Sequence, residues 1–480
     1  MKKQKNDIVS NLFWKFGERI LAQGISFLVS LVLARLLLPS EYGTVALVLV
    51  FINLANVFVS NGLGEALIQK KNANDADFST MFFCSLGLSV VLYVIMFFAA
   101  PLIANYYQDV TLVSVLRVLA LRLPLAAINT IQHAYVAKHM QFKKFFFSTL
   151  GGTLASAIVG ISMAYHGFGI WALVGQYLSN CFIDTVVLFF TVDWRPRLMF
   201  SLLSVKQLLP FGWKLMAAGF ISSLYGELRN LVIGKVYSTE DLAFYNKGNH
   251  FPSLTVTNVD TSISSVLFPA MSSINNDPDH LRALTRKSMR MSSYVVFPMM
   301  MGMCAVGETM IRFLLTDKWI GCVPFLRLSC IYWMIQPLQT ANAQAIKACG
   351  RSDIYLKLET AKKIIGVSLI FVTMRMGVMA VVFSNLLVAA ISIIMNIYPN
   401  KKLIGYGYTD QFKDVFPALF LSSVMGAAVW GIYLLLGNSG YVLILQLISG
   451  AAIYVGLSLL THNDSFDELL KIVKREKGDA

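Results

Sequence analysis

Charged and strongly polar residues recur inside long apolar stretches of this 480-residue chain. In the first stretch, Lys15, Arg19, Gln23, Ser26 and Ser30 are spaced three or four residues apart, which places them on one face of a helix. An ionisable residue inside a membrane costs at least about 2.5 kcal/mol, so it usually faces a cavity or a partner. This stripe therefore predicts a polar path through a membrane.

Other apolar stretches carry similar stripes. Together the stripes predict residues that line a cavity and bind a substrate. These residues are Arg19, Gln23, Arg122, Lys214, Arg229, Asn249 and Asp260. Glu227 and Asp260 are also candidates for ion coupling, because both lie in polar stretches. Cations outnumber anions on these stripes, which favours a phosphate or pyrophosphate ligand. The alternative is that these residues join helices or reach out to the membrane surface, as Lys15 and Lys214 could do near the ends of their stretches.

Motifs for catalysis or metal binding are weak. Asp75 and Asp77 form a D-x-D pair, but the short basic loop around them has no nucleotide-binding pattern. His133 and His250 are isolated, and the six cysteines include no C-x-x-C pair. We therefore predict no catalytic residue, no metal, no cofactor and no enzyme activity.

Composition indicates which elements must position the stripes. Apolar residues make up 56% of the chain and charged residues 14%, against about 45–50% and 25% in soluble proteins. This excludes a soluble enzyme. The net charge of +14 indicates membrane topology rather than nucleic-acid binding.

Fourteen apolar windows predict an all-α integral membrane protein with about fourteen transmembrane helices. Alternate connections carry clusters of Lys and Arg, whereas connections such as 101–110 and 166–169 carry none. Basic loops stay in the cytoplasm, so both termini are predicted to be cytoplasmic. The windows are 13–38, 42–66, 79–104, 111–137, 145–166, 168–192, 208–235, 241–270, 288–315, 322–347, 355–374, 377–398, 412–436 and 440–461.

An internal duplication predicts the domain organisation. Trp14-Lys15 matches Trp213-Lys214 at an offset of 199, and Pro124-Leu125 matches Pro337-Leu338 at an offset of 213. Both copies start after an even number of spans, which makes them parallel repeats. We predict an N-lobe of six helices over residues 1–204, a pseudo-symmetric C-lobe of six over 205–407, and a final helix pair with a cytoplasmic tail over 408–480.

Several segments carry a family resemblance. Residues 33–43 (LARLLLPSEYG) and 61–69 (NGLGEALIQ), with 233–235 (IGK), 245–247 (YNK) and 268–270 (FPA), resemble the polysaccharide transporter family. Its members include lipopolysaccharide O-unit flippases, within the multidrug, oligosaccharidyl-lipid and polysaccharide exporter superfamily. The resemblance spans essentially the whole chain.

The resemblance implies a flippase with two six-helix lobes and a cationic cavity. It would carry a polyprenyl-pyrophosphate-linked oligosaccharide to the outer leaflet by alternating access, with Arg19, Lys214 and Arg229 as the best cavity candidates. The implied location is the bacterial inner membrane. The implied partners are the lipid-linked oligosaccharide, membrane lipids and polysaccharide polymerase or assembly proteins, with no nucleic acid. The alternative is a multidrug or other small-molecule antiporter of the same superfamily.

Overall fold

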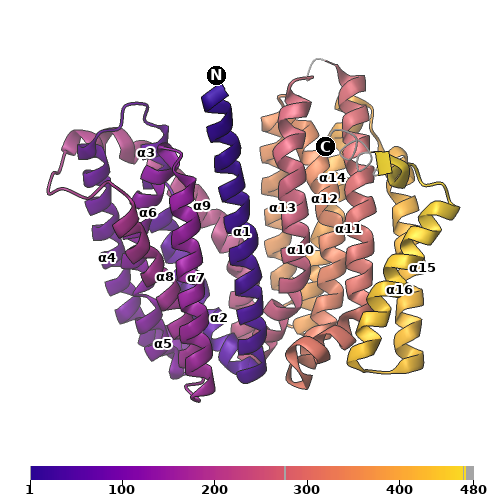
Figure 1. The fold of residues 1–480 in the computed structure, drawn as a ribbon, viewed down its shortest axis with the longest axis horizontal. Helices are drawn as coiled ribbons and strands as arrows, with labels where there is room; N and C mark the ends of the chain where they lie inside the picture. Colours follow the sequence, from indigo (N-terminus) through magenta and orange to yellow (C-terminus); the bar gives the residue numbers. More distant parts are fainter. Residues whose placement is uncertain (1, 275–276, 469, 472–480) are drawn as a thin grey trace. The chain divides into compact units, whose positions relative to one another are not determined.

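The computed structural model describes residues 2–274, 277–468, 470 and 471, with all their side chains except those of 2–16 and 142. In this part of the chain every regular element is a helix (Figure 1). The helices are α1 (Lys2–Leu36), α2 (Pro39–Ser60), α3 (Leu63–Gln69), α4 (Asp75–Tyr107), α5 (Thr111–Leu119), α6 (Arg122–Lys138), α7 (Phe142–Tyr165), α8 (Ile170–Thr191), α9 (Leu202–Val236), α10 (Thr239–Ser272), α11 (Pro278–Leu315), the 3₁₀ helix η1 (Asp317–Cys322), α12 (Val323–Ala348), α13 (Ser352–Thr373), α14 (Val378–Ile404), α15 (Tyr408–Leu436) and α16 (Gly440–Leu460).

Each of the fourteen predicted windows falls on one helical rod of the described chain. Two rods are interrupted, since α2 is followed after a short break by α3, and α5 by α6. At about 1.5 Å per residue, a rod of 20 residues crosses the hydrocarbon core of about 30 Å. The prediction of an all-helical membrane protein is confirmed.

Polarity distinguishes four of these rods from the rest. Ten described segments are long and apolar enough to span a membrane, and α9, α10, α12 and α13 are not among them. These four helices contain 35, 34, 26 and 22 residues, so their length suffices. The predicted site residues Lys214, Arg229, Asn249 and Asp260 lie on α9 and α10. Four of the seven predicted cavity residues therefore lie on helices too polar to qualify, whereas Arg19, Gln23 and Arg122 lie on segments that do.

The chain divides into two compact units, Met1–Ala243 and Phe244–Ala480. The first contains α1 to α9, and the second contains most of α10 together with α11 to α16. α9 belongs to the first unit because it packs against α2, α3 and α4. The starts of α1 and α9 lie 200 residues apart and both helices have 35 residues. The division at residues 204 and 407 predicted from the repeat stays a prediction.

The basic connections of the first unit meet at one end of its helices. The Lys138 ammonium donates to the carbonyl of Lys70, whose own ammonium donates to Asp77 Oδ1 at 2.8 Å. Just beyond, Lys144 at the start of α7 donates to Asp193 Oδ2, after the end of α8, at 2.8 Å. Hydrogen bonding to Lys144 lowers the pKa of Asp193. The side of the membrane that this end faces stays a prediction.

The break between α2 and α3 depends on glycine. Gly62 has a φ of +96°, a left-handed conformation that L side chains rarely adopt. A Cβ there would lie 2.4 Å from the carbonyl oxygen of Gly212 on α9. Glycine at 62 therefore lets the chain turn while α9 passes close by.

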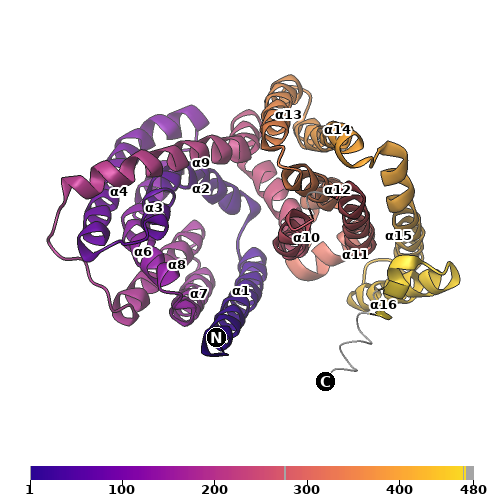
Figure 2. The same ribbon diagram turned by 90° about the horizontal axis from the view of Figure 1, so that it is seen from above.

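Glycines also bring α7 and α8 together. A Cβ on Gly152 of α7 would lie 2.7 Å from the carbonyl oxygen of Asn180 on α8, and one on Gly160 would lie 3.0 Å from Gln176 Cβ. Such close approach is typical of membrane helices packed through small residues. Within the first unit, α7 lies between α1 and α8 (Figure 2).

In the second unit, the long helix α11 packs against α12, α15 and α16. The final helices α15 and α16 also pack on each other, at one edge of the unit (Figure 2). Their apolar contact with α11 includes buried Tyr294, Leu421, Met425 and Tyr454. The Tyr454 hydroxyl donates to the carbonyl of Tyr294 at 2.9 Å. The last helix pair is thus part of the second unit.

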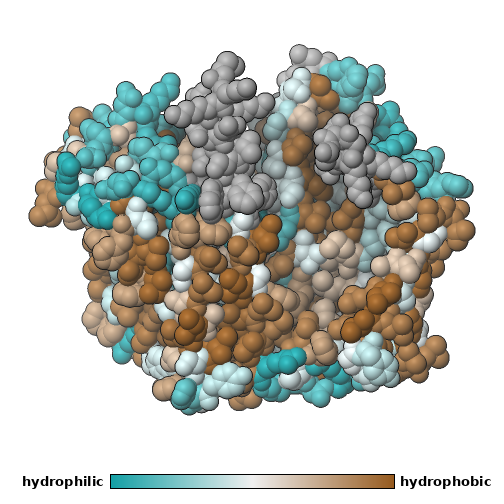
Figure 3. Space-filling model, in the orientation of Figure 1, coloured by the Kyte–Doolittle hydropathy of each residue, from teal (hydrophilic) through white to brown (hydrophobic). Residues whose placement is uncertain are grey.

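Surface hydropathy follows the pattern expected of a membrane protein. On the face drawn in Figure 3, hydrophobic residues cover the middle of the helices and hydrophilic residues gather at the helix ends. Many large apolar side chains of both units are exposed, including Phe98 at 72% and Leu435 at 85%. Lipid tails can cover such side chains in a membrane.

Candidate functional site

The predicted site residues belong to both units. Arg19 and Gln23 on α1, Arg122 on α6, and Lys214, Glu227 and Arg229 on α9 lie in the first unit, whereas Asn249 and Asp260 on α10 lie in the second. Arg19, Gln23 and Arg122 are half-buried, and Lys214 is exposed. The side chain of Lys15 lies outside the described residues.

Glu227 is held by two asparagines. Asn53 Nδ2 on α2 donates to Glu227 Oε1 at 3.2 Å, and Asn230 Nδ2 donates to Oε2 at 2.7 Å. Asn53 can reach Glu227 because α2 packs along α9. Residues two apart point to different faces of a helix, and no ion pair links Glu227 to Arg229 within the described chain. The carboxylate is therefore held by neutral donors and not by the nearby arginine.

Arg229 is the most deeply buried of the predicted cations. Its side chain and backbone together are 6% exposed. Its Nε and Nη2 atoms are buried, and neither has a hydrogen-bond partner within the described part of the protein. A buried guanidinium that lacks partners is costly. Arg229 therefore offers unused donors to an anion.

Arg122, at the start of α6, combines an aromatic contact with an unused donor. Its guanidinium lies 5.4 Å from the ring centroid of Tyr177 on α8. Its Nε atom is buried and has no hydrogen-bond partner in the described chain. Stacking of this kind holds the side chain in place and leaves hydrogen-bonding capacity available.

The two site residues of the second unit have partners on α12. Trp333 Nε1 donates to Asn249 Oδ1 at 2.9 Å, and Thr340 Oγ1 donates to Asp260 Oδ2 at 2.9 Å. The other carboxyl oxygen of Asp260, Oδ1, is buried and unpartnered within the described residues. Asp260 therefore retains an acceptor that a proton or a cation could occupy.

A carboxylate of the first unit, Asp184, was not predicted from the sequence. Asp184 on α8 accepts from Asn129 Nδ2 at 2.9 Å and from Ser148 Oγ at 2.5 Å. Its Oδ2 atom lies 3.6 Å from His133 Nε2. The signal was present, because an ionisable residue in the middle of the window 168–192 is itself a functional hypothesis. From the sequence, His133 was interpreted as an isolated histidine, but in the structure it faces this carboxylate.

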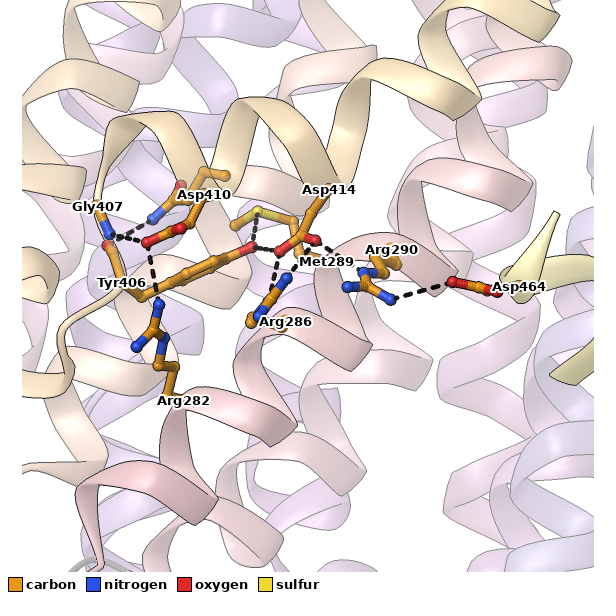
Figure 4. Close-up of polar contacts among 10 residues, drawn as sticks. Arg282, Arg286, Met289, Arg290, Tyr406, Gly407, Asp410, Asp414 and Asp464 are labelled. Atoms are coloured by element: carbon orange, nitrogen blue, oxygen red, sulfur yellow. Dashed lines mark hydrogen bonds and ion pairs between the residues drawn. The ribbon is translucent and has the colours of Figure 1, made fainter.

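A second missed feature is a cluster of arginines and aspartates that joins α11 to α15 (Figure 4). Asp414 accepts from Arg286 Nε and Nη2 at 2.8 and 2.9 Å, and from Arg290 Nε at 2.9 Å. The Tyr406 hydroxyl also donates to Asp414 at 2.8 Å. Burial, together with this hydrogen bond, raises the pKa of Tyr406, so the phenol keeps its proton.

The outer members of this cluster balance its charge. Arg282 Nη2 donates to Asp410 Oδ2 at 3.1 Å, and Arg290 Nη1 lies 3.7 Å from Asp464 Oδ2. Three arginines thus face three aspartates, as Figure 4 shows. Because little charge remains for a ligand, we interpret the cluster as an anchor for the last helix pair.

Comparisons with known proteins agree with this architecture. Residues 32–324 match the family model described as "Polysaccharide biosynthesis protein". The chain is 25% identical over 424 residues to the lipopolysaccharide biosynthesis protein WzxC of Escherichia coli K12, covering 86% of this chain and 85% of the relative. It is 24% identical over 489 residues to the succinoglycan biosynthesis transport protein ExoT of Rhizobium meliloti, covering 98% and 97%.

A solved structure shares the fold. The lipid II flippase MurJ, in an inward closed conformation, matches 95% of this chain and 99% of its own length, with a TM-score of 0.74 and 15% identity. At this identity the match establishes the fold alone.

Proposed function

The chain belongs to the polysaccharide biosynthesis protein family, and from this premise we propose a specific transport activity. One relative of the chain is a transport protein. The protein is a membrane transporter for polysaccharide precursors. We propose that it is a flippase that moves a polyprenyl-pyrophosphate-linked oligosaccharide from the cytoplasmic to the outer leaflet. Alternating access through a cationic cavity carries the substrate, and both termini lie in the cytoplasm of a bacterial cell.

The unused donors of Arg229 are the observation that carries this proposal. A buried guanidinium with two unpartnered nitrogens becomes favourable when an anion supplies the missing acceptors. A pyrophosphate offers several oxygens in a geometry that suits the planar guanidinium. Arg122, with its own unused Nε, and exposed Lys214 add positive charge to the same unit. These features support an anionic substrate over the cationic drug of a multidrug antiporter.

The carboxylates of these helices do not cancel that charge. Glu227 is held by Asn53 and Asn230, and Asp260 by Thr340. The arginines therefore remain available to a ligand. This division of partners supports binding of a pyrophosphate head, while the isoprenoid tail stays in the lipid.

Membrane potential can drive the movement without any chemistry. An anion leaving a cell with a negative interior gains about 2.3 kcal/mol per charge per 100 mV. Coupled ions could add to this force. Asp260, with its buried and unpartnered Oδ1, is the better of the two coupling candidates predicted from the sequence. Both acceptor oxygens of Glu227 are already occupied.

Gene deletion followed by lipid analysis tests the proposal. Loss of the protein should cause one polyprenyl-pyrophosphate glycan to accumulate on the cytoplasmic face, as measured by mass spectrometry with a sidedness probe. Wild type should relieve the accumulation, and Arg229→Gln should restore about a tenth of the flux or less, since a hydrogen bond to a charged group contributes about 1.5–3 kcal/mol.

Arg117→Gln is the matched control. Arg117 is also an arginine of the first unit, but its Nε donates to the carbonyl of Phe97 at 3.2 Å and its guanidinium stacks on that ring at 4.1 Å. This variant should transport normally at equal protein levels. Wild-type flux in Arg229→Gln, or unchanged lipids in the deletion strain once redundancy is excluded, would contradict the proposal.

A further inference from the structure

A polar group around Asp184 lies inside the first unit. It joins three helices, with Asn129 and His133 from α6, Ser148 from α7 and Asp184 from α8. Asn129 and His133 are four residues apart and so share a helix face. The unit therefore brings an imidazole and a carboxylate together from different helices.

Close helix packing creates this group. Gly152 lies one turn beyond Ser148 on α7, and a Cβ on it would approach Asp184 Cβ to 3.3 Å. Glycine at this position lets α7 and α8 approach each other closely, and the Ser148 hydroxyl can then reach Asp184. His133 is held on its other side by Phe145, whose ring stacks on the imidazole at 4.7 Å. The site is therefore built from fixed parts.

The donors to Asp184 leave its charge in place. Asn129 and Ser148 are neutral, so a carboxylate with a neutral His133 carries a net charge of −1 in a membrane-spanning region. Such a charge is costly there. The 3.6 Å between His133 Nε2 and Asp184 Oδ2 is long for a hydrogen bond, but it is short enough for an ion pair. Protonation of the imidazole would neutralise the group and draw α6 toward α8.

Other charged and titratable groups around α6 and α8 have different positions or partners. Tyr177 stacks with Arg122, Lys144 on α7 binds Asp193, and Glu18 on α1 accepts from Thr149 on α7 at 2.9 Å. The remaining groups on α6 and α8 and on the helices packed against these two are Cys181 on α8, Tyr135 and Lys138 on α6 with His139 directly after it, Lys143 and Tyr165 on α7, Tyr42 and Glu41 on α2, Glu65 on α3, Asp75, Asp77, Cys84, Tyr93, Tyr106 and Tyr107 on α4, and Arg117 on α5. Within the described residues, His133 is the cation placed within ion-pair distance of Asp184.

We propose that Asp184 and His133 form a proton-binding site in the first unit and that it is loaded and emptied during each transport cycle. The proposal rests on the flippase function and adds a coupling ion to it. In loading, a proton from water adds to the ring nitrogen of His133 that lacks one, and the imidazolium pairs with Asp184. In emptying, the same N–H bond breaks and the proton returns to water.

Exposure supports exchange of this proton. The His133 side chain is 40% exposed and that of Asp184 is 18% exposed. Along α6, His133 lies between Asn129 and Lys138, toward the basic end of the unit. The imidazole can therefore exchange a proton with the surface of the unit while its partner Asp184 lies part-buried beside it.

Proteoliposomes provide the transport test. The probe is the lipid-linked glycan recovered from the deletion strain, with a fluorescent pH dye trapped inside the vesicles. At a fixed membrane potential, a gradient of one pH unit should change wild-type glycan accumulation by up to about tenfold if one proton moves per cycle. Asp184→Asn and His133→Gln should still transport under the potential, but without the response to pH or the proton flux.

Matched variants identify the site. Glu18→Gln removes a hydrogen-bonded carboxylate of the same unit and should keep the full gradient response. If Asp260→Asn abolishes the response while Asp184→Asn and His133→Gln retain it, the site is not where we place it and the inference fails. His133→Gln leaves the hydrogen bonds of Asp184 in place, so it tests the idea even if Asp184→Asn folds poorly.

A measurement without substrate separates this inference from the proposed function. Infrared difference spectra of the purified protein between pH 8 and pH 5 should contain carboxylate and imidazole bands that both Asp184→Asn and His133→Gln remove. Identical spectra in wild type and both variants would overturn the site. If these bands appear but no variant moves the glycan, the proposed function fails and the proton site stands.

Discussion

Replacing Asp414 by asparagine should loosen the start of α15 from α11. Asp414 accepts two hydrogen bonds from Arg286 and one each from Arg290 and Tyr406, all between 2.8 and 2.9 Å. Its side chain is 4% exposed, whereas those of the two arginines are 35% exposed. Breaking a fully buried ion pair costs about 3–5 kcal/mol. Because both arginines can turn toward water, we expect a loss of about 2 kcal/mol.

Amide hydrogen exchange measures this loss locally. A reduction of about 2 kcal/mol in the free energy of opening speeds exchange about 30-fold, and the change should be concentrated in residues 408–416. Tyr406→Phe removes the neutral hydroxyl that donates to Asp414. It should therefore cost about 1 kcal/mol and speed exchange about fivefold. The two variants therefore form a graded series.

Asp353→Asn is the control, because it removes an aspartate partner of an arginine elsewhere in the second unit. Arg351 donates to both oxygens of Asp353, at 2.9 and 3.0 Å, but the two side chains are 48% and 51% exposed. This variant should leave exchange in α15 unchanged. The reasoning is refuted if Asp414→Asn exchanges within about twofold of wild type, or if exchange rises equally in every helix.

Two further predictions concern the first unit. Gly62→Ala should lower the melting temperature in detergent, because a left-handed φ of +96° and a Cβ 2.4 Å from the Gly212 carbonyl together cost about 2–4 kcal/mol; an unchanged melting temperature would contradict this. Hydrogen bonding to Lys144 lowers the pKa of Asp193, so the pair stabilises the fold above about pH 4 and loses this effect as the pH falls through the lowered pKa. The melting temperature of wild type should exceed that of Asp193→Asn at pH 7, and the gap should close in acid; a gap that stays constant would argue against the pair.

The helices were predictable because the membrane imposes a simple requirement. Each crossing needs about 20 residues with a mostly apolar surface, and each predicted window falls on a helical rod. The interruptions were not predicted. The break at Gly62 depends on the carbonyl of Gly212, and a single sequence does not reveal which distant backbone passes near a glycine.

Cross-helix pairs were harder to predict for the same reason. Arg282, Arg286 and Arg290 lie in or beside one of the basic connections that were interpreted from the sequence as a topology signal, although their spacing of four also places them on one helix face. Their aspartate partners lie more than 100 residues further along the chain. Only the packing of α15 on α11 shows that these arginines bind aspartates and do not remain free basic residues of a loop.

Net charge alone therefore does not define a cationic path, since what matters is which charges remain unpaired. Near the ends of α11 and α15, arginines and aspartates neutralise each other. Deeper in the helices, Glu227 and Asp260 take neutral donors, and Arg229 keeps two buried nitrogens without a protein partner in the described chain. If this division is functional, removing the neutral donors should matter as well. Asn53→Ala would remove one of the two neutral donors that hold Glu227 and leave its negative charge less well compensated among the cationic residues of the first unit, so it should weaken transport even though Asn53 itself carries no charge.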